Sequence, residues 1–182
     1  AITLNPTFEL AYLNLAYALV SLERNEEALA IYEDCLKHCS SAKLYQNLGI
    51  TLQQIGRMKD AQQAYLQAIN IDPAMGSAYR HLAEITKVGG KGDIDISATV
   101  KAAFDVQGMD EDAHKHLSFA WAKVNDGQKN YPEAFAAYKQ GNDLKRKQHT
   151  YSKGTSNKLF ETITSAYDEA FLSNTSNSNL SE

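Results

Sequence analysis

The chain repeats itself at a spacing of 33 or 34 residues. Tyr12, Tyr45 and Tyr79 stand 33 and then 34 positions apart, and a leucine follows each of them three positions later. A period of this size is typical of stacked helical hairpins, in which each unit buries its apolar face against its neighbours. The repeat therefore predicts an all-α solenoid. For such a fold the first question about function is which ligand the chain binds and not which reaction it catalyses.

Small and large residues alternate within each predicted hairpin as closely crossing helices require. Alanine or glycine stands where the two helices meet, and tyrosine and leucine surround these positions at helical spacing. Asn25 and Gly56 are expected in the turns between helices, because both residue types tolerate positive φ. The small residues of the predicted crossings are Ala16, Ala28, Gly49, Ala61 and Ala83.

The predicted architecture is a right-handed superhelix of antiparallel helix pairs. Its first residues copy the end of a repeat, which suggests a piece of a longer array. The last residues form a polar tract that is predicted to be a linker or disordered. In order, we expect a repeat remnant at 1–8, full hairpins at 9–41 and 42–75, a divergent unit at 76–112, a hairpin-like unit at 113–149, a capping helix at 150–172 and the tail at 173–182.

Composition argues against several classes of function. The net charge of −4 is unlike that of a general nucleic-acid or acidic-membrane binder. No apolar run approaches the roughly 20 residues that span a bilayer, and no signal peptide is visible. Cys35 and Cys39 are too few for a disulfide framework, which suits a reducing compartment. We therefore expect a cytoplasmic protein that contacts neither nucleic acid nor membrane.

The repeat resembles the tetratricopeptide-repeat superfamily. This resemblance implies paired helices whose concave groove holds a peptide or a partner protein, without catalysis. The positions that match the signature of the superfamily are Tyr45, Leu48, Gly49, Leu52, Ala61, Tyr65 and Pro73.

The second half is similar to the region that precedes the catalytic domain of bacterial tetratricopeptide-repeat sulfotransferases. The likeness covers roughly 76–172, although Trp121 and Ala122 depart from it, and it is carried by the phrases at 117–123, 131–135 and 141–146. It implies an alternative in which the parent polypeptide uses a phosphoadenosine phosphosulfate donor. This chain would then recruit the substrate or contact a C-terminal catalytic domain of the same polypeptide. The phosphosulfate-binding phrase of that family is absent here, so no catalytic residue carries over.

Predicted ligand contacts lie on the first helix of each hairpin, which lines the concave groove of such a solenoid. Asn14 and Asn47 hold equivalent positions, and a primary amide offers a donor and an acceptor to a peptide bond. A similar ladder of amides lies in the repeats of O-linked N-acetylglucosamine transferases, and His81 stands where a third asparagine would be. The alternative is that these amides only tie adjacent helices together. The other predicted contacts are Leu13, Tyr17, Lys43, Gln46, Ile50, Arg80 and Glu84.

Two further motifs have ordinary structural interpretations. Cys35, His38 and Cys39 share one helical face and suggest zinc, but a fourth ligand is missing and a buried cysteine commonly acts as a small apolar residue. The glycine-rich run at 89–93 lacks the spacing of a phosphate loop, so we expect a connector. We predict no metal and no cofactor.

Two more patterns bear on partners. The carboxylate clamp of chaperone-binding repeats is mostly absent, because Leu13 and Tyr17 occupy two of its positions. The basic run at 145–147 suits a helix end, with docking to an acidic partner or a neighbouring domain as the alternative. No nucleophile–base arrangement can be assembled, so we expect a scaffold and not an enzyme.

Overall fold

The computed structural model of the protein describes residues 8–86, 95–148 and 153–166, and these ranges hold helices and no strand. Two units are distinguished, Ala1–Lys145 and Arg146–Glu182. The predicted all-α class is confirmed. The helices are α1 (Glu9–Ser21), α2 (Asn25–Leu36), α3 (Ala42–Gln54), α4 (Met58–Ile71), α5 (Gly76–Ile85), α6 (Ile96–Ala103), α7 (Glu111–Gly127), α8 (Tyr131–Gln148) and α9 (Lys153–Ala166).

The first two hairpins are α1–α2 and α3–α4, and they cross where the small residues stand. Ala16, Ala28 and Ala61 are fully buried, as the alternation of small and large residues predicts. At the second crossing, a Cβ added to Gly49 would lie 2.5 Å from Cε1 of Tyr65. Only glycine therefore allows the Tyr65 ring to lie against α3. This contact fixes the distance between α3 and α4.

The turns of these hairpins agree with the sequence only in part. Gly56 has a φ of +82°, as expected for the turn between α3 and α4. The expectation for Asn25 was wrong, because Asn25 is the first residue of α2 and Glu23 takes the positive φ of +59°. A carboxylate residue thus occupies the left-handed position, which favours glycine or asparagine.

Beyond α5 the regular hairpin gives way to a different packing. α5 packs along α7, and the short α6 packs on both α5 and α7. At the crossing of α5 and α7, a Cβ on Gly76 would overlap the carbonyl oxygen of Ala113. The two backbones therefore touch at Gly76. Asp110 begins α7 as predicted, since its Oδ1 accepts a hydrogen bond from the Ala113 backbone N–H at 2.7 Å.

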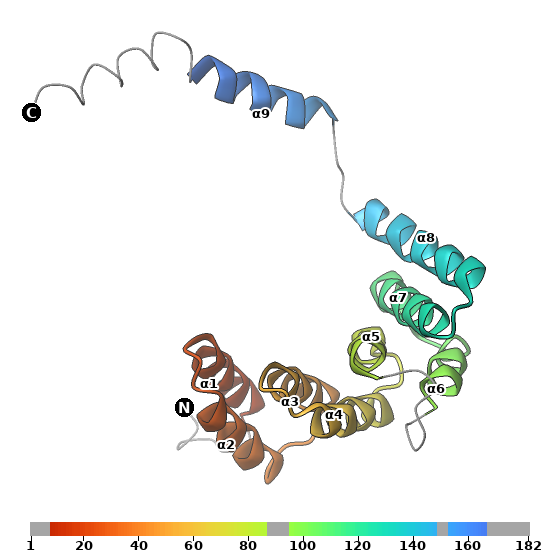
Figure 1. The fold of residues 1–182 in the computed structure, drawn as a ribbon. Coiled ribbons are helices and arrows are strands. Elements are labelled where there is room, and N and C mark those ends of the chain that lie inside the picture. The colour runs from red at the N-terminus through yellow and green to blue at the C-terminus, as the bar shows by residue number, and fades with distance from the viewer. Residues whose placement is uncertain (1–7, 87–94, 149–152, 167–182) are drawn as a thin grey trace, which may run out of the picture. The chain divides into compact units, whose positions relative to one another are not determined.

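The core of the first unit is continuous from α2 to α7. Leu82, Val100 and Leu117 are fully buried and come from α5, α6 and α7 respectively. Figure 1 shows α1, α3, α5 and α7 along one side of this unit, with α2, α4 and α6 along the other. We call α1, α3, α5 and α7 the inner helices. They carry the candidate site.

Several predicted segments lie wholly or partly outside the described residues. These are the repeat remnant at 1–8, the glycine-rich run at 89–93 and the tail at 173–182. The predicted capping helix corresponds to α9, which belongs to the second unit. Its capping role stays a prediction, as do the predicted unit boundaries.

Replacing Gly76 with alanine should destabilise the first unit. The new methyl group would meet backbone at Ala113, and overpacking of this kind costs about 1–3 kcal/mol. Gly141→Ala is the matched control, because its methyl would meet only the ring of Phe119, at 3.0 Å from Cε1. Urea unfolding of both variants compares them. Equal free energies of unfolding would show that the α5–α7 crossing is not close.

Candidate functional site

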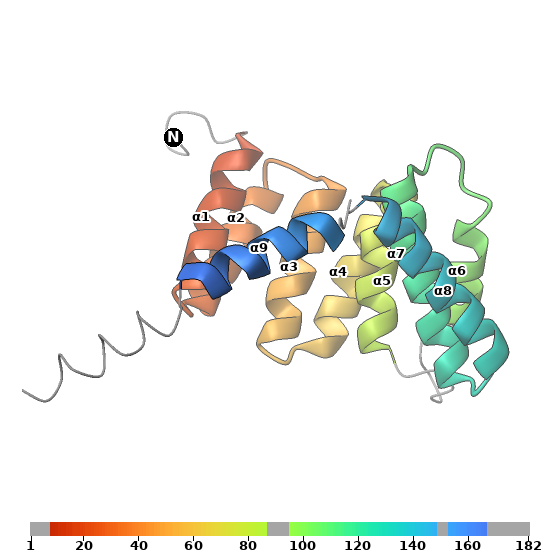
Figure 2. The same ribbon diagram turned by 90° about the horizontal axis from the view of Figure 1, so that it is seen from above.

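The inner helices α1 and α3 each present one helical face that is turned away from their hairpin partners, and side chains of α5 and α7 continue this face. Repeat spacing makes the positions equivalent from α1 to α5, and α7 extends the row (Figure 2). We call this set of side chains the inner face. It consists of Leu10, Leu13, Asn14 and Tyr17 on α1, Lys43, Asn47 and Ile50 on α3, Arg80, His81 and Glu84 on α5, and Asp112, Lys115, His116, Phe119 and Lys123 on α7.

Hydrogen bonds join successive inner helices next to this face. The Ser41 hydroxyl, before α3, donates to Glu9 Oε1 on α1 at 2.6 Å. The Gln46 amide of α3 donates to Ser77 Oγ on α5, also at 2.6 Å. Gln46 is 5% exposed. The structure therefore places this predicted contact in a helix-to-helix bond and not on the inner face.

The two equivalent asparagines behave differently from Gln46. Asn14 is exposed and Asn47 is partly exposed. In the described part of the chain, neither side-chain amide makes a hydrogen bond, and the bond that Asn47 does make uses its backbone carbonyl. The alternative that these amides tie adjacent helices together is thus not what the structure contains. Both amides keep a donor and an acceptor available.

Arg80 connects α5 to α7. Its guanidinium lies 5.6 Å from the centroid of the Phe119 ring, and its Nε donates to Glu84 Oε1 at 3.0 Å. Gly141 of α8 faces the same ring, and a Cβ there would lie 3.0 Å from Cε1 of Phe119. The ring is therefore held by α8, and Arg80 is positioned through the ring. Half-exposed cation–π pairs of this kind contribute roughly 0.5–1 kcal/mol.

His81 is held between α4 and its own helix. Its ring stacks on Tyr65, with centroids 5.4 Å apart and an interplanar angle of 13°. The Tyr65 hydroxyl donates to Gln53 Oε1 at 2.8 Å, and His81 Nδ1 lies 3.6 Å from Glu84 Oε2. Burial lowers the pKa of His81, which outweighs the opposite effect of Glu84.

His116 lies on α7 in a similar environment. Its Nε2 is 3.4 Å from Asp112 Oδ2, and Asp112 also pairs with Lys115. Burial lowers the pKa of His116, and Lys115, Arg80 and His81 act in the same direction. Its Nδ1 is buried and has no hydrogen-bond partner among the residues that the structure describes. The imidazole is therefore held neutral near pH 7.

The α1 end of the inner face is apolar. Leu10 is 55% exposed and Tyr17 is 74% exposed, while Leu13 is partly buried. The residues of α1 are apolar on nearly all faces of the helix. This pattern is typical of helices whose surface is covered by a contact. This end therefore offers apolar contact to a ligand.

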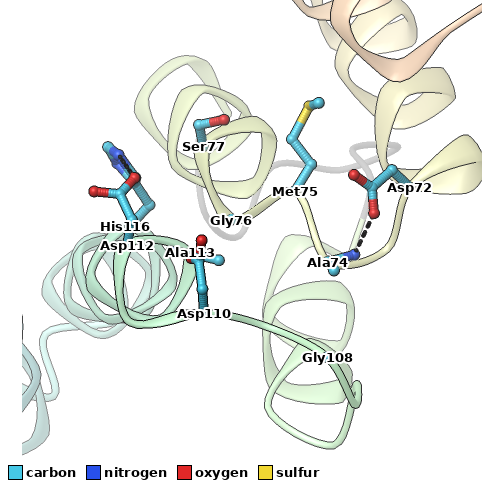
Figure 3. Close-up of a pocket in the computed structure, with 10 residues that line it drawn as sticks. All are labelled: Asp72, Ala74, Met75, Gly76, Ser77, Gly108, Asp110, Asp112, Ala113 and His116. Carbon is cyan, nitrogen blue, oxygen red and sulfur yellow. Dashed lines mark hydrogen bonds and ion pairs between the residues drawn. The ribbon is translucent and has the colours of Figure 1, made fainter.

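A cavity of about 320 Å³ lies between the α4–α5 turn and the start of α7 (Figure 3). Its carboxylates are engaged locally. Asp72 Oδ1 accepts from the Ala74 N–H at 3.0 Å, Asp110 caps α7, and Asp112 pairs with Lys115 and His116. These bonds fix the two loops beside the α5–α7 crossing. We therefore place the candidate site on the inner face and not in this cavity.

The cysteine hypothesis is not supported by the geometry. Cys35 is fully buried on α2 and Cys39 is partly buried, whereas His38 is exposed. Burial raises the pKa of Cys35 to about 12, with Cys39 acting in the same direction, so the thiol stays protonated. Within the described ranges, no three His, Cys, Asp or Glu side chains are grouped to hold a metal ion. Cys35 acts as a small core residue.

Sequence reasoning missed the contribution of α7. His116, Phe119 and Lys123 share one face of that helix but stand outside the regular repeat spacing. A signal was available, since Phe119 and Gly141 fit the pairing of a large ring with a small residue that marks the earlier crossings.

A family model described as tetratricopeptide repeat matches residues 7–74. No curated protein matches the chain. Two solved structures titled as MamA align with TM-scores of 0.57 and 0.55, at 18% and 17% identity. The first alignment covers 82% of this chain and 85% of MamA, and the second covers 83% and 81%. At this identity the likeness concerns the fold.

A third solved structure, YrrB, is titled a TPR protein with an unusual peptide-binding site. It aligns at 17% identity and a TM-score of 0.47, over 79% of this chain and 90% of its own. That likeness is too distant to inform the site. The resemblance to sulfotransferases stays a prediction from the sequence. Among the described helices, none has both the length and the hydropathy to cross a bilayer.

Acidification should weaken the fold through the two inner-face histidines. Because folding lowers the pKa of His81 and His116, the unfolded chain binds protons first as the pH falls through about 6.5. The free energy of unfolding then falls with pH until the folded histidines titrate. In a His81→Gln/His116→Gln variant this fall should be smaller, as measured by urea unfolding between about pH 7.5 and 5.5. Exposed His38→Gln is the control. If the free energy of unfolding of the double variant depends on pH as steeply as that of the unmodified protein, the assignment is contradicted.

Proposed function

Because residues 7–74 match the tetratricopeptide-repeat family model and the helical fold extends to α8, we propose that the chain is a non-catalytic scaffold that holds a segment of a partner protein. The partner segment lies along the inner face, across α1, α3, α5 and α7. A protein partner is the coarse expectation from repeats of this kind. The predicted groove residues define the finer proposal.

The two free asparagine amides are the observation that carries this proposal. Asn14 and Asn47 stand 33 residues apart on neighbouring inner helices, and within the described residues their amides bond to nothing. An extended peptide has unpaired N–H and C=O groups at regular intervals. Amides on successive helices can pair with these groups whatever the side chains of the peptide. This supports recognition of main chain by α1 and α3.

Side chains beside the amides supply the remaining contacts. Tyr17 and Leu13 offer apolar surface on α1, and Ile50 continues this surface on α3. Arg80 and Glu84 offer charge on α5. The stacked His81 takes the place of a third amide. Its partners in the fold are structural, and no nucleophile beside it was identified from the sequence. A cytoplasmic location and service to a following sulfotransferase domain stay predictions from the sequence.

Loss of the inner-face amide and guanidinium should weaken ligand binding. Peptides selected from a random display library on the unmodified protein would be titrated by fluorescence anisotropy against an Asn47→Ala/Arg80→Ala variant. We expect Kd to rise on the order of tenfold or more, because the two changes remove an amide pair and a charged contact.

The matched control changes an asparagine and a cation on the outer helix α4. Lys59 and Asn70 are exposed there, so Lys59→Ala/Asn70→Ala should leave Kd unchanged. An unchanged Kd for the inner-face variant would refute the proposed function.

A further inference from the structure

The inner face changes its chemistry along its length, from apolar on α1 to a surface that carries, among the described residues, unpaired lysines on α3 and α7, with the paired Arg80 and Glu84 between them on α5. From this gradient we infer that the partner segment is an acidic peptide, with apolar side chains on α1 and carboxylates near Lys43, Arg80 and Lys123. The inference rests on the proposed function and names the class of its ligand. It concerns a local feature, since the chain as a whole carries a net charge of −4.

The carboxylates at the α5–α7 end are already neutralised by neighbouring cations. Glu84 accepts from Arg80 at 3.0 Å and lies 3.6 Å from His81. Asp112 pairs with Lys115 and lies 3.4 Å from His116. Each acidic group of this end therefore has a basic partner within the protein.

Two lysines of the inner face have no acidic partner among the described residues. Within the described ranges, the ammonium groups of Lys43 and Lys123 make no ion pair and no hydrogen bond, and both side chains are exposed. Lys123 follows Phe119 by one helical turn, so it continues the row that Arg80 and Phe119 begin. The end of the face thus carries excess positive charge that a ligand carboxylate would balance.

The opposite end carries no positively charged side chain. α1 contains no lysine or arginine, and the carboxylate of Glu9 is engaged by Ser41. Leu10 and Tyr17 are among the most exposed large apolar side chains of the unit. A nucleic acid would gain little from this apolar surface. A peptide can present apolar and acidic side chains at the two ends of one strand.

The length of such a peptide follows from the spacing of the helices. Neighbouring helices pack about 8–10 Å apart, so the four inner helices span roughly 30 Å. An extended chain covers this distance with about ten residues.

The two histidines add a dependence on pH. A bound carboxylate favours imidazolium, so binding should draw protons onto His81 and His116 and should tighten as the pH falls from about 8 to about 6. The groups that face these rings are Glu84 and Arg80 on α5, Lys43 on α3 and Tyr65 on α4 for His81, and Asp112 and Lys115 on α7 with Arg80 and His81 on α5 for His116.

The test uses synthetic fluorescein-labelled peptide pools of about ten residues. One pool has leucine and phenylalanine at one end and aspartate and glutamate at the other. A second has lysine and arginine in place of the acidic residues. We expect the acidic pool to bind the full chain at least about tenfold more tightly by fluorescence anisotropy. The preference should shrink at high salt, because the lysines are exposed.

Charge variants make the test specific to this end of the face. Glu84→Gln should tighten binding of the acidic pool several-fold, a gain that misfolding cannot produce. Arg80→Gln should weaken it by about tenfold. Lys59→Gln on the outer helix α4 is the matched control and should change nothing.

The outcomes separate this inference from the proposed function. Equal binding of both pools, weakened alike by Tyr17→Ala, would overturn the acidic class and leave the scaffold proposal standing. No effect of Glu84→Gln on the acidic pool would also overturn it. If an oligothymidylate competed for the inner face as strongly as the acidic pool does, the ligand class would be a nucleic acid and not an acidic peptide. Failure of every pool to bind would remove both proposals.

Discussion

Two aromatic rings, each held against a glycine, connect the buried core to the inner face. Tyr65 lies against Gly49 and carries the stacked His81, and Phe119 lies against Gly141 and carries Arg80. Both rings contact α5 through these side chains. A side chain at Gly49 would displace the Tyr65 ring and with it His81, whereas the Phe119 ring would need to shift only slightly for a methyl group at Gly141. Core packing thereby sets the geometry of the site.

The first two hairpins could be predicted because their packing is encoded locally. Helical spacing of tyrosine and leucine around Ala16, Ala28 and Ala61 indicates which faces are buried, and the structure confirms these positions. Asp110 was likewise predictable as a cap, since capping involves only neighbouring residues. The left-handed conformation of Glu23 could not be predicted, because the hairpin imposes it on a residue type that does not prefer it.

The second half was less predictable because its contacts are long-range. Gly76 looks like an ordinary residue of an interhelical loop, and its role appears only where α7 crosses α5 at Ala113. The short α6 breaks the repeat spacing, so that spacing could not assign the side chains of α7 to the inner face. Gln46 illustrates the same limit. Its spacing predicted a surface position, but the position of Ser77 on the next repeat turns the amide into an internal bond.

The contacts between inner helices differ in kind along the row. α1 and α3, and then α3 and α5, are joined on this side by hydrogen bonds between flexible side chains, Ser41 to Glu9 and Gln46 to Ser77. At Gly76, α5 meets α7 backbone to backbone. We therefore expect the α5–α7 pair to be the stiffer junction and the two earlier junctions to deform more readily. Adjustments of curvature to guests of different thickness should be taken up at those two junctions, without altering the separation of Arg80 from Phe119.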